Sequence, residues 1–271
     1  MWRKETQYKE FFYRYRHFDD DKCVKSIERL LSKNEMYLSS PLSFNDPYDC
    51  RPHYAFEATD REIKAYLKKL FRENEANATK NDVNRHVTKI LNRVSRTNTD
   101  LETVFNRQYE TFLQSVGMLC FSKSPENILL WSHYASSHTG ICIQFESNVD
   151  TRSVFMLTQN VKYTKDFPII NLVKATDDEK LSKGLLTKAD DWSYEQEYRL
   201  ILPAQQKLVK YPDEALKSVI FGLKTTDHNK DLIKNWIAQR KVKPAIYQAV
   251  MKQGQYGLDF IEVEKGSTIT K

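Results

Sequence analysis

The spacing of apolar residues changes twice along the chain, and this change most constrains the fold. From about residue 60 to residue 115, apolar side chains recur with the period of an amphipathic helix. On either side of this region, apolar residues either alternate with polar ones or form short unbroken runs, as in β-strands. We therefore expect an α+β fold with a mixed or antiparallel central sheet. Residues 1–271 should form a single domain, with 60–115 as a helical insertion within it.

The expected elements are short and frequent outside the insertion. Strands are predicted at residues 11–17, 35–40, 118–122, 140–145, 160–163, 192–202, 216–222, 245–249 and 258–263. Helices are predicted at residues 22–33, 126–136, 177–189 and 229–239, and three more within the insertion.

Composition argues against a membrane-spanning protein, a secreted disulfide-linked protein and the common glycine-rich nucleotide-binding folds. A formal charge of +6 on 271 residues permits an anionic partner without requiring one. No apolar run approaches the length of a membrane span, and the first residues contain no apolar signal-peptide core. The four scattered cysteines are expected to be reduced thiols. We therefore expect a soluble cytoplasmic protein. The absence of glycine-rich phosphate loops disfavours Rossmann and P-loop nucleotide binding.

The sequence Trp-Ser-Tyr-Glu-Gln-Glu-Tyr-Arg at 192–199 is the first place to look for chemistry. In a strand, Glu195, Glu197 and Arg199 would project from one face. Two neighbouring carboxylates raise the pKa of one of them, a common basis for acid–base or charge-stabilising sites. The alternative is a surface face with a weak ion pair between Arg199 and a glutamate.

Polar turn formers surround Pro47 in a second candidate segment. Asn45, Asp46 and Asp49 are typical of a rigid turn in which side chains bond their own backbone. The functional alternative places them at the rim of a cleft.

Two further groups combine aromatic and basic residues. Trp131 and His133 are predicted on a short helix, where each is either a core residue or a ligand contact. The five-residue separation of His133 and His138 is poor for zinc, so no metal is expected. Arg14 and Arg16 lie on one face of the first strand, either solvated or gripping a phosphate.

Several motifs, in this order, resemble a widespread bacterial family known as domain of unknown function 2971. They are Tyr-Arg-Tyr-Arg at 13–16, Leu-Ser-Ser-Pro at 38–41, Phe-Asn-Asp-Pro-Tyr-Asp at 44–49, Cys-Phe-Ser at 120–122, Trp-Ser-His-Tyr-Ala at 131–135, His-Thr-Gly-Ile-Cys-Ile-Gln-Phe at 138–145 and the segment at 192–199. The resemblance runs from about residue 11 to residue 225 and by itself implies no chemistry.

A looser similarity is to the arginine–serine–glutamate class of ADP-ribosyltransferases, whose sheet this fold would resemble. It implies that NAD is the substrate and that its phosphates contact Arg14 or Arg16. Ser39 or Ser122 would steady the nicotinamide ribose, although the family's Ser-Thr-Ser triplet is absent. We place His133 and Tyr134 in the same NAD pocket.

The same similarity assigns roles to the two glutamates. Glu197 would be the catalytic carboxylate that stabilises the cationic ribose, and Glu195 would orient the acceptor. The acceptor would be a protein or a nucleic acid, with no membrane involved, and the protein would act as a toxin or an anti-phage effector. The residues expected to line the acceptor side of the cleft are Asn45, Asp46, Asp49, Trp131 and Arg199.

Two other functions remain open from the sequence. A metal-dependent nuclease could use Asp46, Asp49, Glu195 and Glu197 as its ligands. A non-catalytic module could bind a nucleotide or a nucleic acid in a basic, aromatic cleft.

Overall fold

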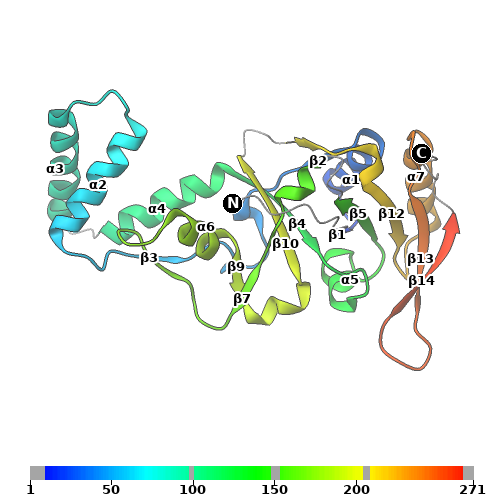
Figure 1. The fold of residues 1–271 in the computed structure, drawn as a ribbon. Helices are drawn as coiled ribbons and strands as arrows, with labels where there is room; N and C mark the ends of the chain where they lie inside the picture. Colours follow the sequence, from blue (N-terminus) through cyan, green and yellow to red (C-terminus); the bar gives the residue numbers. More distant parts are fainter. Residues whose placement is uncertain (1–9, 98–100, 148–152, 204–207, 265–271) are drawn as a thin grey trace. The chain divides into compact units, whose positions relative to one another are not determined.

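A computed structural model describes residues 10–97, 101–147, 153–203 and 208–264. The chain forms two compact units (Figure 1). The first, here the sheet unit, comprises Met1–Ser40, Val116–Val161 and Asp191–Lys271. The second, here the helical unit, comprises Pro41–Ser115 and Lys162–Asp190.

An eight-stranded sheet organises the sheet unit. Its neighbouring strands are antiparallel except for one parallel pair, β12 and β13. In spatial order the strands are β14 (Leu258–Glu264), β13 (Ala245–Met251), β12 (Leu216–Phe221), β5 (Ile141–Ser147), β1 (Glu10–Arg16), β4 (Val116–Ser122), β10 (Glu197–Pro203) and β6 (Gln159–Asn160). The expected α+β class with a mixed, mostly antiparallel sheet is confirmed.

The remaining elements of the sheet unit are short or amphipathic. The helices are α1 (Asp21–Lys33), α5 (Ile128–Tyr134) and α7 (Asp227–Ala238). Strands β2 (Glu35–Tyr37) and β11 (Leu208–Lys210) pair separately, and 3-10 turns span η3 (Val154–Leu157), η4 (Asp190–Glu195) and η5 (Asp213–Ala215). Helix α1 begins where the Asp20 side chain accepts a hydrogen bond from the Cys23 amide, the usual N-cap arrangement.

Each face of the sheet carries its own core. On the face covered by α1, Phe12 of β1 packs with Ile27 of the helix in a large apolar cluster. On the opposite face, Tyr15 of β1 packs with Trp131 of α5. We call these the α1 face and the α5 face. Successive side chains along β1 alternate between these two faces, so even-numbered residues of the strand belong to the α1 face and odd-numbered residues to the α5 face.

Three helices occupy the region where three were predicted. They are α2 (Asp60–Asn74), α3 (Lys80–Thr97) and α4 (Leu101–Gln114). The helical unit also contains η1 (Pro41–Ser43), β3 (His53–Ala55), β7 (Lys162–Thr164), β8 (Ile169–Asn171), α6 (Asp177–Leu185) and β9 (Thr187–Ala189). Among the described residues no helix is both long and apolar enough to cross a membrane.

Some predicted element boundaries are wrong. The strand expected at 160–163 is two short strands in different sheets, β6 and β7. The strand expected at 35–40 ends at Tyr37, and the helix expected at 177–189 ends at Leu185 and gives way to β9. The strand expected from Trp192 begins only at Glu197, because residues up to Glu195 form a 3-10 turn. Gln196, with a φ of 46°, joins that turn to the strand in the left-handed region.

Candidate functional site

The register of the central strands assigns the predicted site residues to two faces of the sheet. Tyr13 of β1 lies opposite Ser122 of β4, which lies opposite Glu197 of β10. Directly opposite residues point to the same side of a sheet, so all three side chains belong to the α5 face. Arg14 and Arg16 belong to the α1 face. The two arginines and Glu197 therefore project from opposite faces.

Arg14 is buried on the α1 face, with a relative exposure of 7%. Its guanidinium carbon lies 5.8 Å from the centre of the Phe121 ring. Its Nη1 atom is buried and has no hydrogen-bond partner among the described residues. Burial lowers the pKa of Arg14 well below its usual range, and the positive charge of Arg16 lowers it further. Among the described residues, the Nη1 donor of the Arg14 guanidinium is thus left unsatisfied in a partly aromatic setting.

Arg16 lies on the same face and is half-buried. Its Nη2 atom donates a hydrogen bond of 3.4 Å to the Ser26 hydroxyl of α1, while its buried Nε has no partner among the described residues. Burial lowers the pKa of Arg16 as well. Two guanidinium groups two residues apart, with unused N–H donors, match what an anion such as phosphate requires.

Glu197 and Arg199 form a bidentate ion pair on the α5 face. The Arg199 Nε and Nη2 atoms donate to the two carboxylate oxygens of Glu197, each at 2.9 Å. Arg199 is fully buried and Glu197 is 6% exposed. The expectation that they share a strand face, with Arg199 as the neighbouring cation, is confirmed. The pair is buried, which contradicts the alternative of an exposed surface pair.

Glu195 lies outside β10, so the expectation that it belongs to the same strand as Glu197 is wrong. It ends the 3-10 turn, where its side chain is 4% exposed and its Oε1 accepts a hydrogen bond of 2.6 Å from the Tyr134 hydroxyl. The Ser122 hydroxyl donates to the Glu195 carbonyl at 2.7 Å. The Asn127 amide donates to the preceding carbonyl, that of Tyr194, at 2.6 Å. These bonds fix the turn and explain why the strand starts late.

The three remaining candidate residues of the sheet unit, Trp131, His133 and Ser39, each have a different environment. Trp131 is fully buried and donates to the Pro125 carbonyl at 2.7 Å, the core alternative for this residue. His133 is exposed. Ser39 pairs with Met118 through the backbone in an isolated bridge.

The turn residues of the second candidate segment belong to the helical unit. The Asp46 carboxylate accepts a hydrogen bond of 2.9 Å from the Tyr48 amide, as predicted for a rigid turn. Asp49 is buried and lies 3.8 Å from the Lys188 ammonium. Asn45 is exposed. The four carboxylates proposed for a nuclease thus belong to two different units. Asp49, in the helical unit, also has a cationic partner in Lys188.

A left-handed turn after α5 had no signal that we recognised in the sequence. Ser136, Ser137 and His138 have φ values of 45°, 52° and 71°. Gly140 follows this turn. The position requires glycine, because a Cβ atom there would lie 2.1 Å from the Arg16 carbonyl oxygen. The run of small and polar residues before this glycine is what could have indicated the turn.

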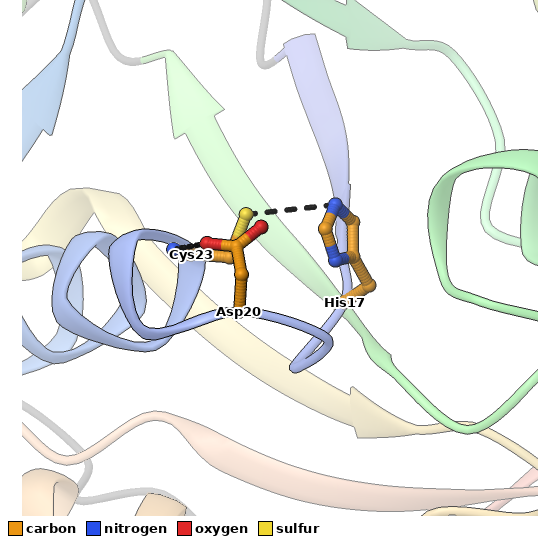
Figure 2. A group of neighbouring side chains, drawn as sticks. All are labelled: His17, Asp20 and Cys23. Carbon is orange, nitrogen blue, oxygen red and sulfur yellow. Dashed lines mark hydrogen bonds between the residues drawn. The ribbon is translucent and has the colours of Figure 1, made fainter.

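One group of side chains is close enough to hold a metal ion among the residues that the structure describes. It consists of His17, Asp20 and Cys23, drawn in Figure 2. Their spacing of three residues each was visible in the sequence. Cysteine spacing alone does not reveal this group, because it combines one cysteine with a histidine and an aspartate.

Residues 130–200 match the model of a family described as protein of unknown function (DUF2971). The match runs from α5 to β10 and includes Tyr134, Glu195, Glu197 and Arg199. It supports the first resemblance drawn from the sequence. No curated protein and no solved structure matches the chain. The similarity to ADP-ribosyltransferases stays a prediction.

Proposed function

We propose that the protein binds a nucleotide and holds its phosphate on Arg14 and Arg16, at the α1 face. The observation that carries this proposal is the buried Arg14 guanidinium, whose Nη1 has no partner among the described residues. A buried, uncompensated charge is costly to the folded protein. An anionic ligand would supply the missing countercharge and accept the unused N–H groups.

The nucleotide class rests on the ADP-ribosyltransferase resemblance, which makes NAD the first ligand to test. The net charge of +6 is also compatible with an anionic ligand. Transfer of ADP-ribose is the more demanding form of this proposal. It needs a carboxylate beside the ribose, and Glu197 projects from the other face and is paired with Arg199. Binding is therefore the function that the geometry supports best.

Isothermal titration with pyrophosphate, ADP and NAD would test the proposal. We expect measurable binding of at least one of them by the wild-type protein and none by Arg14→Met. Arg51→Met is the matched control, because it removes the same charge from a partly exposed arginine paired with Glu110 at 3.2 Å. Equal binding by both variants, or no binding by the wild-type protein, would contradict the proposal.

The same samples distinguish a binding module from a transferase. Labelled NAD would be incubated with the protein and a cell lysate, and nicotinamide release and label transfer would be measured. Turnover that is abolished by Glu197→Gln, in a sample whose circular dichroism shows that the variant is folded, would support transfer. Binding without turnover would support a non-catalytic module.

A further inference from the structure

We propose that His17, Asp20 and Cys23 form a zinc site with three protein ligands and an open fourth position. The site has its own residues and its own test, and it stands whether or not a nucleotide binds at Arg14.

The local fold brings the three ligands together from rigid elements. His17 directly follows β1, Asp20 caps α1, and Cys23 lies in the first turn of that helix. The connection between strand and helix is only a few residues long, and the central strand and the helix hold its two ends. Rigid supports of this kind keep ligands in place for a metal.

The distances suit tetrahedral zinc. One ligand atom from each residue lies within 4.8 Å of the others, and the His17 Nε2 atom is 3.5 Å from the Cys23 sulfur. Zinc bonds of about 2.0 Å to nitrogen and about 2.3 Å to sulfur, at a tetrahedral angle, separate those two atoms by about 3.5 Å. The observed nitrogen–sulfur distance therefore needs no adjustment.

Asp20 can cap the helix and bind a metal at the same time. Its Oδ1 atom accepts the hydrogen bond of 2.7 Å from the Cys23 amide. Figure 2 shows the other carboxylate oxygen on the side of the sulfur and the imidazole ring. A carboxylate that divides its two oxygens in this way is held in orientation by the helix.

A neighbouring residue orients the imidazole for metal binding. The Asp19 carboxylate lies 3.3 Å from Nδ1 of His17, the ring nitrogen that faces away from the sulfur. The Asp19 amide also donates a hydrogen bond of 3.4 Å to Nδ1, so Asp19 holds this side of the ring in either tautomer. In the tautomer with the proton on Nδ1, shared with the carboxylate, Nε2 has the free lone pair, which is the usual arrangement around zinc-bound histidines. Mixed nitrogen, oxygen and sulfur donors favour zinc over magnesium or calcium. Because Asp20 is exposed, the metal can enter from solvent.

Cobalt substitution provides the test. The purified protein would be titrated with Co²⁺ while thiolate-to-cobalt charge-transfer absorption is recorded, and zinc would then be added in competition. We expect one equivalent to bind, with the band lost in Cys23→Ser and displaced by zinc. Cys120→Ser is the control for a thiol outside the site and should leave the band unchanged.

Asp20→Asn separates ligation from folding, because asparagine caps helices as well as aspartate does. We expect this variant to keep its helical circular dichroism and to lose at least tenfold in cobalt affinity. Asp21→Asn, one residue further along the first turn, should bind as the wild-type protein does.

Alkylation distinguishes a metal site from a simple reactive thiol. Zinc should protect Cys23 from iodoacetamide, and EDTA should restore its reactivity. The proposal is overturned if the cobalt band persists in Cys23→Ser, if Asp20→Asn binds as tightly as Asp21→Asn, or if zinc leaves the alkylation rate unchanged.

Discussion

Replacing Arg14 by methionine should stabilise the protein in a buffer free of phosphate. Arg14 buries a charged group whose Nη1 has no partner among the described residues. An unsatisfied buried donor on a charged group costs about 2–3 kcal/mol, the upper part of the usual range. The contact with Phe121, at 5.8 Å, returns about 1 kcal/mol of this. Methionine has a similar length, adapts to irregular space and needs no hydrogen bond. We expect a net gain of about 1–2 kcal/mol in the free energy of unfolding.

Urea denaturation measures this difference directly. With a slope of roughly 3 kcal/mol per molar urea, the midpoint should rise by about 0.3–0.7 M, with the slope itself unchanged. Leu119→Met is the matched control, since it places the same side chain at a fully buried position on the same face. That control should be neutral or lose less than about 1.5 kcal/mol.

A second arm links stability to the ligand. Pyrophosphate at about one hundred times its dissociation constant should stabilise the wild-type protein by about 2.7 kcal/mol and leave Arg14→Met unchanged. The reasoning is refuted if Arg14→Met loses 2 kcal/mol or more without ligand, because such a loss means that Arg14 is satisfied in the folded protein.

Three further changes have effects whose sign follows from the structure. Glu197→Gln removes the carboxylate charge that forms a bidentate pair with the fully buried Arg199, so denaturant unfolding should show a loss of about 3–5 kcal/mol. Burial, and secondly a nearby lysine, lower the pKa of His138 in the folded state, so the unfolded chain binds more protons below its own pKa of about 6.5. The free energy of unfolding should therefore fall as the pH drops below that value. The variant His138→Asn should show a smaller fall, and asparagine is chosen because it tolerates the left-handed backbone. Denaturant unfolding at a series of pH values measures both. Gly140→Ala would place a Cβ atom 2.1 Å from the Arg16 carbonyl oxygen and should lower the thermal midpoint through a loss of about 2–3 kcal/mol.

Local patterns predicted the elements whose causes are local. The alternation in β1 and the Asp20 cap with its following apolar residues lie within a few positions of the elements that they specify. The three helices of the helical unit were predicted from their hydrophobic period. In the structure the Thr59 hydroxyl, which accepts a hydrogen bond from the Glu62 amide, caps the first of them. Hydrophobic period and capping sufficed for these elements.

The turn before β10 illustrates what local patterns could not predict. Residues 192–199 have the aromatic content of a strand. The bonds that hold Tyr194 and Glu195 in a 3-10 turn come from Asn127 and Ser122, which are 67 and 73 residues away in the sequence. A preference worth a few tenths of a kcal/mol per residue is outweighed by two hydrogen bonds of about 1 kcal/mol each, one buried and one partly buried.

The candidate site depends on register, which is also non-local. Alternation correctly put Arg14 with Arg16, and Glu197 with Arg199. It could not say whether the two pairs share a face, because that depends on Tyr13 lying opposite Ser122 and Ser122 opposite Glu197. A shift of one residue at either pairing would reverse the relation. The sequence order of arginine, serine and glutamate is therefore compatible with either face. The paired strands separate the buried cations from the carboxylate, which favours two independent functions for them, ligand binding by the arginines and core stability by the Glu197–Arg199 pair.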